Sequence, residues 1–296
     1  MNFAIIGVGG YIAPRHLEAI KDMGHNLVAA YDLNDSVGIM DRYFPECHFY
    51  TDMERFEAYV DSVKGTSQEV QYIAICSPNY MHAPHIKFAL SHGAHVICEK
   101  PLVLNVSDID ELAKYEQKYN RRVYTVLQLR VHDAILNLKN KVETSTVATH
   151  KIELDYMTSR GAWYHESWKG DTRKSGGLST NIGVHFFDML TWIFGEPEAV
   201  TVVDYSPSLE SGTLKLKKAD VKWSLTIDRS RLPVSAVDSG KTTFRSIKID
   251  GEEFEFSEGF TELHKRVYKD ILEGRGYGLD AARPAIKIVE QIRASR

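Results

Sequence analysis

Short apolar runs alternate with helix-like stretches through the first 126 residues of the chain. Each run is bounded by glycine, proline or polar residues, as is typical of a buried strand, and the stretches between the runs repeat apolar positions every three or four residues. This alternation predicts a parallel sheet with helices on both faces, an α/β doubly wound unit of the Rossmann type. Its strands are expected near residues 3–8, 27–31, 48–50, 72–76, 94–98 and 122–126.

From Thr149 onward the pattern changes to longer strands with few helices between them. Such a pattern predicts an α+β domain with a large, mostly antiparallel, open-faced sheet, one face of which covers a core. Its strands are expected at residues 151–157, 199–205, 212–216, 221–228, 244–249 and 252–256, and helices at 134–142, 260–272 and 282–293. The expected domains are therefore 1–126 and 127–281, with the helix 282–293 packing back on the first.

Composition narrows the class of protein. Of the 296 residues 43% are hydrophobic and 26% are charged, and no apolar run approaches the ~20 residues of a membrane span. The net charge of -4 argues against a general nucleic-acid binder. The start of the chain enters a strand without a basic segment, so no export signal is expected and the protein is expected to be cytoplasmic. Cys47, Cys76 and Cys98 fit neither a disulfide framework nor a zinc site and are expected to be reduced.

A glycine turn follows the first strand and leads into a helix. Glycines in such a turn let backbone amides approach a pyrophosphate, and the helix amino terminus favours its negative charge. Ile12 stands where a third glycine is usual, which weakens the fingerprint. Asp32 ends the second strand, where a carboxylate binds ribose hydroxyls and repels a 2'-phosphate, so NAD is expected rather than NADP. The candidate residues of the turn are Gly7, Gly9, Gly10, Tyr11 and Ile12.

Charged and polar residues follow two later strands of the same predicted sheet. Glu99, Lys100 and Pro101 come directly after one apolar run, and the segment from Ser77 to His82 comes after another. Open α/β sheets bind their ligands at the carboxyl ends of the strands, so these residues are expected in the site.

Together the glycine turn, Ser77-Pro78-Asn79 with His82, and Glu99-Lys100-Pro101 resemble the Gfo/Idh/MocA family of sugar-oxidising enzymes. The resemblance implies an NAD-dependent oxidoreductase with an NAD-binding domain and a domain for substrate and oligomer contacts, assembled as a homo-oligomer, a dimer or tetramer. It implies that Lys100 is catalytic, that Glu99 lies beside the nicotinamide and that a cis bond precedes Pro101. The cofactor-binding residues that it adds to the turn and Asp32 are Ser77, Pro78, Asn79, His82, Glu99 and Gln128.

A glycine-rich segment interrupts the strands of the second half and begins a helix near residue 176. Asn181, His185 and Asp188 are spaced as one polar stripe along this helix. In the resembling family the histidine of such a segment is the acid/base, and an aspartate often stands where this chain has Asn181. An amide cannot stabilise an imidazolium as a carboxylate does, so the division of proton transfer between His185 and Lys100 stays open. A metal site from His185 and Asp188 is the alternative, although hydride transfer needs none.

Basic and aromatic residues gather between Ser159 and Ser175 of an otherwise acidic chain. Guanidinium groups bind phosphate or carboxylate, and aromatic rings stack on a base or sugar. A solvated loop with structural aromatics is the alternative. The candidate substrate-binding residues are Arg160, Trp163, Tyr164, Trp168, Lys169 and Arg173.

This loop, Tyr11 to His16 and the late Glu258-Gly259-Phe260-Thr261 resemble the branch of the family that oxidises UDP-N-acetylglucosaminuronate at C3 for cell-surface polysaccharide (O-antigen) sugars. That branch can reoxidise its cofactor with 2-oxoglutarate, which is therefore a candidate second substrate. The resemblance implies His185 as base and Lys100 as its electrostatic partner, with the reverse open. Another sugar or inositol dehydrogenase of the family, and a non-catalytic NAD-binding regulator, are the alternatives.

Overall fold

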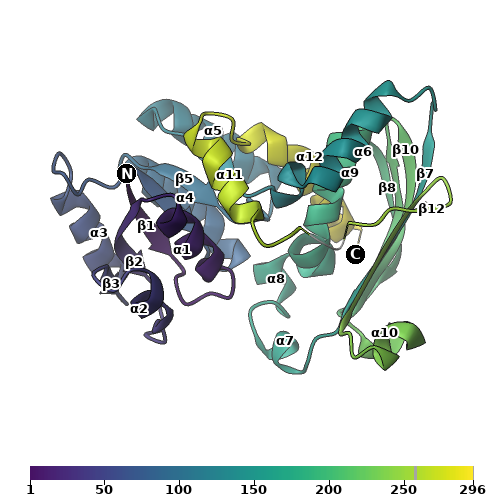
Figure 1. Ribbon diagram of the computed structural model, residues 1–296, viewed down its shortest axis with the longest axis horizontal. Coiled ribbons are helices and arrows are strands. Elements are labelled where there is room, and N and C mark those ends of the chain that lie inside the picture. The colour runs from purple at the N-terminus through teal and green to yellow at the C-terminus, as the bar shows by residue number, and fades with distance from the viewer. Residues whose placement is uncertain (257–258, 296) are drawn as a thin grey trace. The chain divides into compact units, whose positions relative to one another are not determined.

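The computed structural model describes residues 1–256 and 259–295, and the chain divides into two compact units (Figure 1). The first unit comprises residues 1–103, 107–128 and 261–282, and the second comprises residues 104–106, 129–260 and 283–296. Glu258, which belongs to the late motif, lies outside the described residues.

The first unit is built on a six-stranded parallel sheet in the order β3-β2-β1-β4-β5-β6. This order confirms the doubly wound Rossmann prediction. The strands are β1 (Asn2–Ile6), β2 (Asn26–Tyr31), β3 (His48–Tyr50), β4 (Tyr72–Ile75), β5 (His95–Cys98) and β6 (Val123–Thr125). The helices are α1 (Ala13–Asp22), α2 (Ile39–Tyr43), α3 (Met53–Ser62), α4 (His82–Ser91), α5 (Val106–Tyr119) and α11 (Leu263–Leu272).

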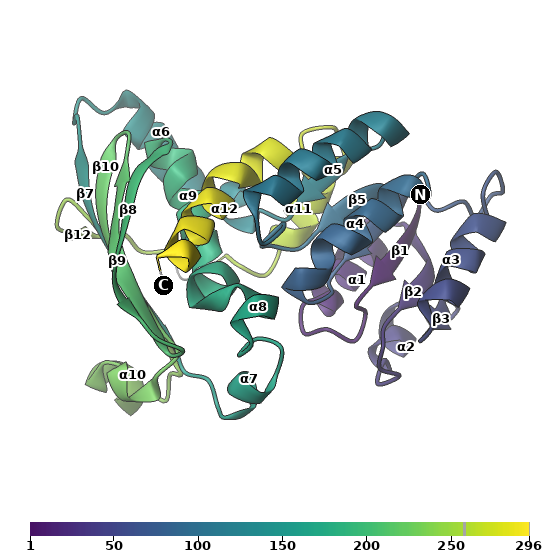
Figure 2. The same cartoon turned by 180° about the vertical axis from the view of Figure 1, so that it is seen from behind.

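Helices cover both faces of this sheet, with α1 and α11 in front in Figure 1 and α4 and α5 in front in Figure 2. Because both faces are covered, the central strands are apolar throughout rather than alternating. All five residues of β1 are buried. The polar residues that follow the strands are consequently left at the carboxyl edge of the sheet.

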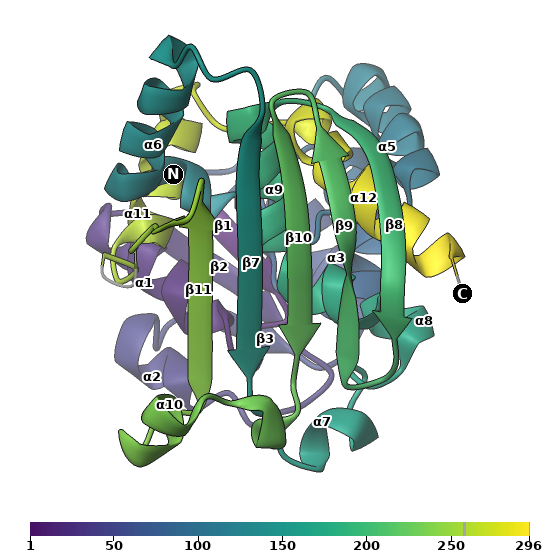
Figure 3. The ribbon, with the colours of Figure 1, turned by 90° about the vertical axis from the view of Figure 1, so that its right-hand side faces the viewer.

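The second unit carries a six-stranded sheet in the order β12-β11-β7-β10-β9-β8, seen face-on in Figure 3. All neighbours are antiparallel except β7 and β10, so the mostly antiparallel prediction is confirmed. The strands are β7 (His150–Thr158), β8 (Pro197–Tyr205), β9 (Leu209–Leu216), β10 (Ala219–Thr226), β11 (Thr243–Ile249) and β12 (Glu252–Glu253). The last strand is shorter than the expected 252–256.

One face of this sheet forms a core with the helices of its own unit. Val221, Trp223 and Leu225 alternate with more exposed residues along β10, as expected for a strand with one covered face. The ring of Trp223 meets Phe187 edge-to-face at 5.5 Å. The helices are α6 (Asp133–Thr144), α7 (Trp163–Glu166), α8 (Thr172–Ser175), α9 (Val184–Phe194), α10 (Val234–Asp238) and α12 (Leu279–Ala294), which begins in the first unit.

The C-terminal segments divide differently from the expected boundaries. Helix α11 belongs to the first unit, because its apolar face is buried there and the Tyr268 hydroxyl lies 2.7 Å from His16 Nδ1. The chain from Arg283 onward groups with the second unit rather than the first. Its Arg293 donates to Thr180 Oγ1 at 2.8 Å and to the carbonyl of Leu104. A pattern of hydrophobic residues does not predict such polar contacts, so it could not assign this segment to the second unit.

Two further expectations concern the whole chain. Cys47, Cys76 and Cys98 are free thiols, as predicted. Within residues 1–256 and 259–295, no helix has the length and apolar character needed to cross a membrane.

Candidate active site

The glycine turn forms a narrow cradle at the carboxyl end of β1. Gly7 has φ +88°, and a Cβ atom there would lie 2.7 Å from backbone atoms of Cys76 and Ser77, so a larger residue fits neither the conformation nor the space. Gly10 N–H donates to the Gly7 carbonyl at 3.1 Å and closes the turn. Tyr11 is 96% exposed, so its ring lies free of the core at the mouth of the turn. The close backbone approach and the helix that follows fit a dinucleotide pyrophosphate.

Asp32 lies beside the same turn. Its carboxylate accepts the Gly9 N–H at 2.9 Å and the Asn34 N–H at 3.0 Å. A Cβ at position 9 would lie 3.2 Å from that carboxylate, so the second glycine keeps the acid close to the turn. Ile12 immediately precedes α1 and leaves both glycines in place. These residues can hold the adenosine half of NAD.

The segment after β4 is held by buried histidines. Ser77 Oγ lies 2.8 Å from His85 Nδ1, whereas His82 places its ring nitrogens 2.7 Å from the Pro101 carbonyl and 2.8 Å from the Ser77 carbonyl. His82 is 1% exposed. It therefore joins the loops that follow β4 and β5, and its ring nitrogens are occupied by backbone carbonyls. The sequence predicts that His82 binds the cofactor. Of the other two residues predicted in this segment, Asn79 is buried and Pro78 is half-buried.

Lys100 follows β5 and is half-buried, and the peptide bond between it and Pro101 is cis, as the resemblance implied. Glu99 is 5% exposed and accepts hydrogen bonds from His16 and His264 on Oε1. Burial alone raises the pKa of Glu99, but the hydrogen bonds from His16 and His264, followed by the charge of His264, outweigh it and hold the pKa well below its usual value. An ionised carboxylate therefore adjoins Lys100. Gln128 ends the first unit and begins the short helix η2 (Gln128–Val131).

In the second unit Asn181 lies in the π-helical turn η3 (Ser179–Gly183), and His185 lies in the first turn of α9. Both are partly exposed, although most of their neighbours are buried. The polar stripe stops there, because Asp188 is 3% exposed and forms a bidentate pair with Arg130 at 2.6 and 3.0 Å. The predicted polar stripe is therefore wrong at Asp188, because its carboxylate forms an ion pair with Arg130 in the core instead of facing outward with His185. The π turn makes the spacing differ from that of a continuous α-helix.

Three side chains that sequence reasoning missed hold this segment. The buried carboxylate of Glu210, on β9, accepts the N–H groups of Leu178 and Ser179 at 3.0 and 2.8 Å. Arg293 and Arg130 hold Thr180 and Asp188 respectively. No local pattern marks these partners, because each lies far along the chain from the residue it holds.

The basic and aromatic loop divides into buried and exposed residues. Tyr164 is 2% exposed and packs with Leu178 and Ile227, and its hydroxyl accepts a hydrogen bond from Asn181 Nδ2 at 3.0 Å. Its position makes it a support for Asn181 rather than an exposed substrate contact. Arg173 is 88% exposed at its side chain and pairs with Asp171.

The remaining residues of the loop form a cationic aromatic cluster. Lys169 Nζ lies 4.5 Å from the ring centre of Trp168 and 5.8 Å from that of Trp163. Burial, followed by the charge of Arg160, lowers the pKa of Lys169. Trp163 and Arg160 are exposed. This cluster offers two positive charges and two indole rings to a ligand.

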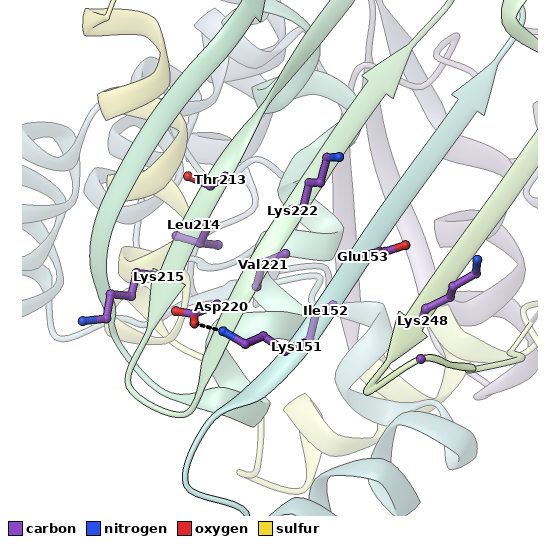
Figure 4. Close-up of a pocket in the computed structure, with 11 residues that line it drawn as sticks. Lys151, Ile152, Glu153, Thr213, Leu214, Lys215, Asp220, Val221, Lys222 and Lys248 are labelled. Atoms are coloured by element: carbon purple, nitrogen blue, oxygen red, sulfur yellow. Dashed lines mark hydrogen bonds and ion pairs between the residues drawn. The ribbon is translucent and has the colours of Figure 1, made fainter.

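A pocket on the outer face of the second sheet contains none of the predicted site residues (Figure 4). Charged side chains of neighbouring strands line it, and Lys151 Nζ pairs with Asp220 at 2.5 Å (Figure 4). Its lining offers ion pairs rather than catalytic groups.

Two family profiles match the chain. Residues 1–127 match the oxidoreductase family with an NAD-binding Rossmann fold (GFO_IDH_MocA), and residues 147–218 match the C-terminal alpha/beta domain of the same oxidoreductase family.

Solved structures extend this likeness along the full chain. The WlbA (WbpB) dehydrogenase from Thermus thermophilus, in complex with NAD and alpha-ketoglutarate, is 48% identical with a TM-score of 0.97, over 100% of this chain and 96% of that chain. Its complex with NAD and UDP-GlcNAcA matches at 48% identity and a TM-score of 0.95, over 99% of this chain and 94% of that chain.

A curated relative is more distant. The 2,7-anhydro-N-acetylneuraminate hydratase of Mediterraneibacter gnavus is 24% identical over 207 residues, which are 68% of this chain and 52% of that protein. The chain thus spans about half the length of this curated relative.

Proposed function

The chain belongs to the Gfo/Idh/MocA family of oxidoreductases, and we propose that it oxidises the C3 hydroxyl of UDP-N-acetylglucosaminuronate to the 3-keto sugar nucleotide. The observation that carries the proposal is the 48% identity, over nearly the whole of both chains, to a dehydrogenase crystallised with NAD and with UDP-GlcNAcA. The glycine cradle and Asp32 support NAD as the cofactor, which accepts a hydride when bound.

His185 is the proposed base for the hydroxyl proton. An imidazole with an ordinary pKa of about 6.5 can accept a proton at neutral pH. Lys100 stabilises the negative charge that develops on the C3 oxygen as this proton leaves. Asn181 contributes hydrogen bonding rather than charge, because it is an amide held by Tyr164.

The loop cluster of Arg160, Trp163, Trp168 and Lys169 is the proposed site for the anionic part of the substrate. A uronate carboxylate and a diphosphate need cations, and the uracil and sugar rings offer faces on which indoles can stack. The two cations and two indoles of the cluster match those demands.

The wider setting follows from the same proposal. The 3-keto product would enter the synthesis of cell-surface polysaccharide sugars such as those of O-antigen, in the cytoplasm. Alpha-ketoglutarate (2-oxoglutarate) is the proposed acceptor that regenerates the oxidised cofactor, supported by its presence in the complex of the 48% identical dehydrogenase. We also propose a homo-oligomer, a dimer or tetramer, since the second sheet has an open face.

The test incubates the purified chain with UDP-N-acetylglucosaminuronate and NAD, with and without 2-oxoglutarate, and analyses the sugar nucleotide by mass. The expected product is lighter by two hydrogens, and 2-hydroxyglutarate accumulates when the acceptor is present. Absence of the 3-keto product under both conditions would refute the substrate assignment. Turnover of free glucose or inositol instead would favour another dehydrogenase of the family.

A further inference from the structure

Four buried side chains form a continuous hydrogen-bonded network within the first unit, directly before Lys100. His16 Nε2 lies 3.0 Å and His264 Nε2 lies 2.8 Å from the same oxygen, Oε1 of Glu99. The Tyr268 hydroxyl lies 2.7 Å from His16 Nδ1. None of the four residues is more than 5% exposed. The network therefore joins α1, the end of β5 and α11 out of contact with water.

The protonation states of this network follow from its geometry. Burial raises the pKa of Tyr268 well above its usual value, so the hydroxyl stays protonated. It therefore donates a hydrogen bond to His16 Nδ1. Burial also lowers the pKa of His16, so its ring is neutral and carries its one proton on Nε2, facing Glu99. Tyr268 thereby selects the tautomer in which His16 donates to the carboxylate.

The second oxygen of Glu99 reaches the residue assigned to the chemistry. Oε2 accepts the backbone N–H of Lys100 at 3.2 Å, while Oε1 accepts from the two histidines. A carboxylate held from both sides has little freedom to rotate, so it fixes the main chain at Lys100. His16 also lies on the helix that follows the glycine turn. The network thus links the cofactor cradle to the catalytic strand end.

Glu99, His16 and His264 are also residue types that bind metal ions, and their ligand atoms lie within 4.8 Å of one another. The hydrogen bonds account for the arrangement without an ion, because both histidine Nε2 atoms donate to an ionised oxygen. A positioning role fits these bonds and their connection to Lys100.

We propose that His16, His264 and Tyr268 are positioning residues that orient Glu99 and, through its bond to the backbone of Lys100, hold the Lys100 ammonium in its catalytic position. The proposal rests on the function proposed above, in which Lys100 stabilises the charge on the C3 oxygen. Loss of a network member should therefore lower kcat while leaving NAD affinity nearly unchanged, because the glycine cradle stays intact.

The experiment compares His264→Leu, His264→Gln and Tyr268→Phe with the wild-type chain. Leucine removes the donor to Glu99, whereas the glutamine amide can place an N–H near the position of Nε2. We expect His264→Leu to lower kcat by about tenfold or more at an NAD Kd within about threefold of wild type, and His264→Gln to recover most of the loss. Tyr268→Phe should give an intermediate loss, because His16 can then adopt the other tautomer.

The matched control is His95→Leu, which removes a half-buried histidine at the opposite end of β5, where its Nδ1 accepts the Arg122 N–H at 3.0 Å. This variant should keep its kcat. Amide hydrogen exchange of residues 99–102 supplies a measurement independent of turnover. Exchange at the Lys100 amide should accelerate in His264→Leu and return toward wild type in His264→Gln.

A purely structural role predicts a different result, namely faster exchange throughout the first unit and a normal kcat for the fraction that is folded. That result, or a kcat within about twofold of wild type in both His264→Leu and Tyr268→Phe, would overturn the proposal. If His264→Leu does not fold, Tyr268→Phe decides alone, and a kcat within about twofold of wild type in that variant would overturn the proposal. If the wild-type chain fails to oxidise the sugar nucleotide, the proposed function fails, and the exchange at Lys100 still tests the network.

Discussion

The side-chain amide of Asn181 donates a hydrogen bond to the buried hydroxyl of Tyr164 across 3.0 Å. A carboxylate at position 181 could only accept from that hydroxyl, whereas the amide donates and leaves the hydroxyl proton of Tyr164 for another acceptor. The amide of Asn181 thus sets the direction of a hydrogen bond in the segment that carries His185.

Tyr164→Phe tests this pair, since phenylalanine keeps the packing against Leu178 and Ile227 but removes the acceptor. We expect kcat to fall roughly 2- to 10-fold, the rate equivalent of one hydrogen bond. Steady-state kinetics would measure the change. The control is Tyr119→Phe, which changes the tyrosine that ends α5 and should leave kcat unchanged. An unchanged kcat in Tyr164→Phe would show that the hydrogen bond between Tyr164 and Asn181 does not contribute to catalysis.

Lys100→Met and His185→Asn should each slow hydride transfer by at least about 100-fold, the lower range for a positioned acid or base. Methionine removes the cation and keeps an unbranched side chain that is one atom shorter, and asparagine cannot take up the hydroxyl proton near neutral pH. Single-turnover appearance of NADH absorbance measures the step. Lys114→Met, at an exposed position of α5, is the control. Near-normal turnover in either variant would discard the role given to that residue.

Arg160→Ala or Lys169→Ala should raise the KM for the sugar nucleotide by about tenfold or more, because each removes a charge-assisted contact to an anion. NAD affinity should change much less. Parallel measurements of substrate KM and NAD Kd would separate the two, with Lys141→Ala on the exposed side of α6 as the control. A larger effect on NAD would assign the loop to the cofactor instead.

Asp188→Ala should destabilise the second unit by about 3–5 kcal/mol, because it removes one member of a buried, bidentate ion pair. Urea unfolding followed by tryptophan fluorescence measures the loss. Asp220→Ala breaks the exposed pair with Lys151 and should leave the urea midpoint nearly unchanged. Equal midpoints for the two variants would contradict a structural role for the buried pair.

Acid should destabilise the first unit through His85. Burial, followed by the charge of His82, lowers the pKa of His85 from 6.5 to about 4. Between pH 4 and 6.5 the unfolded chain therefore binds a proton at His85 more readily than the folded chain does. The contribution of His85 to the free energy of unfolding is fully present above pH 6.5 and is lost as the pH falls toward 4. The loss at pH 5 is about 2 kcal/mol. His85→Asn keeps a polar atom near Ser77 but does not titrate.

Urea unfolding at pH 8 and pH 5 would measure this dependence in the wild-type chain and in His85→Asn. We expect the wild-type chain to lose about 2 kcal/mol more than the variant over that range. Equal losses in the two chains would show that His85 does not carry the dependence.

The sequence by itself determined the features that depend on local order along the chain. Apolar runs alternating with helical stretches specify a parallel sheet, because each strand must be covered on both faces. Gly7 and Gly9 mark a turn that admits little else, and Glu99, Lys100 and Pro101 mark the end of a strand at the ligand edge. The free thiols and the mostly antiparallel second sheet followed from equally local patterns.

Tertiary structure alone decided which distant side chains meet. His16 and His264 are 83 and 165 residues from the Glu99 that they share, and Arg130 is 58 residues from Asp188. A helical or strand period says which face of an element is apolar, but it carries no information about the partner that a buried polar atom finds. Those partners depend on sheet register and helix packing, and they decided that Asp188 and Tyr164 support the site from within the core.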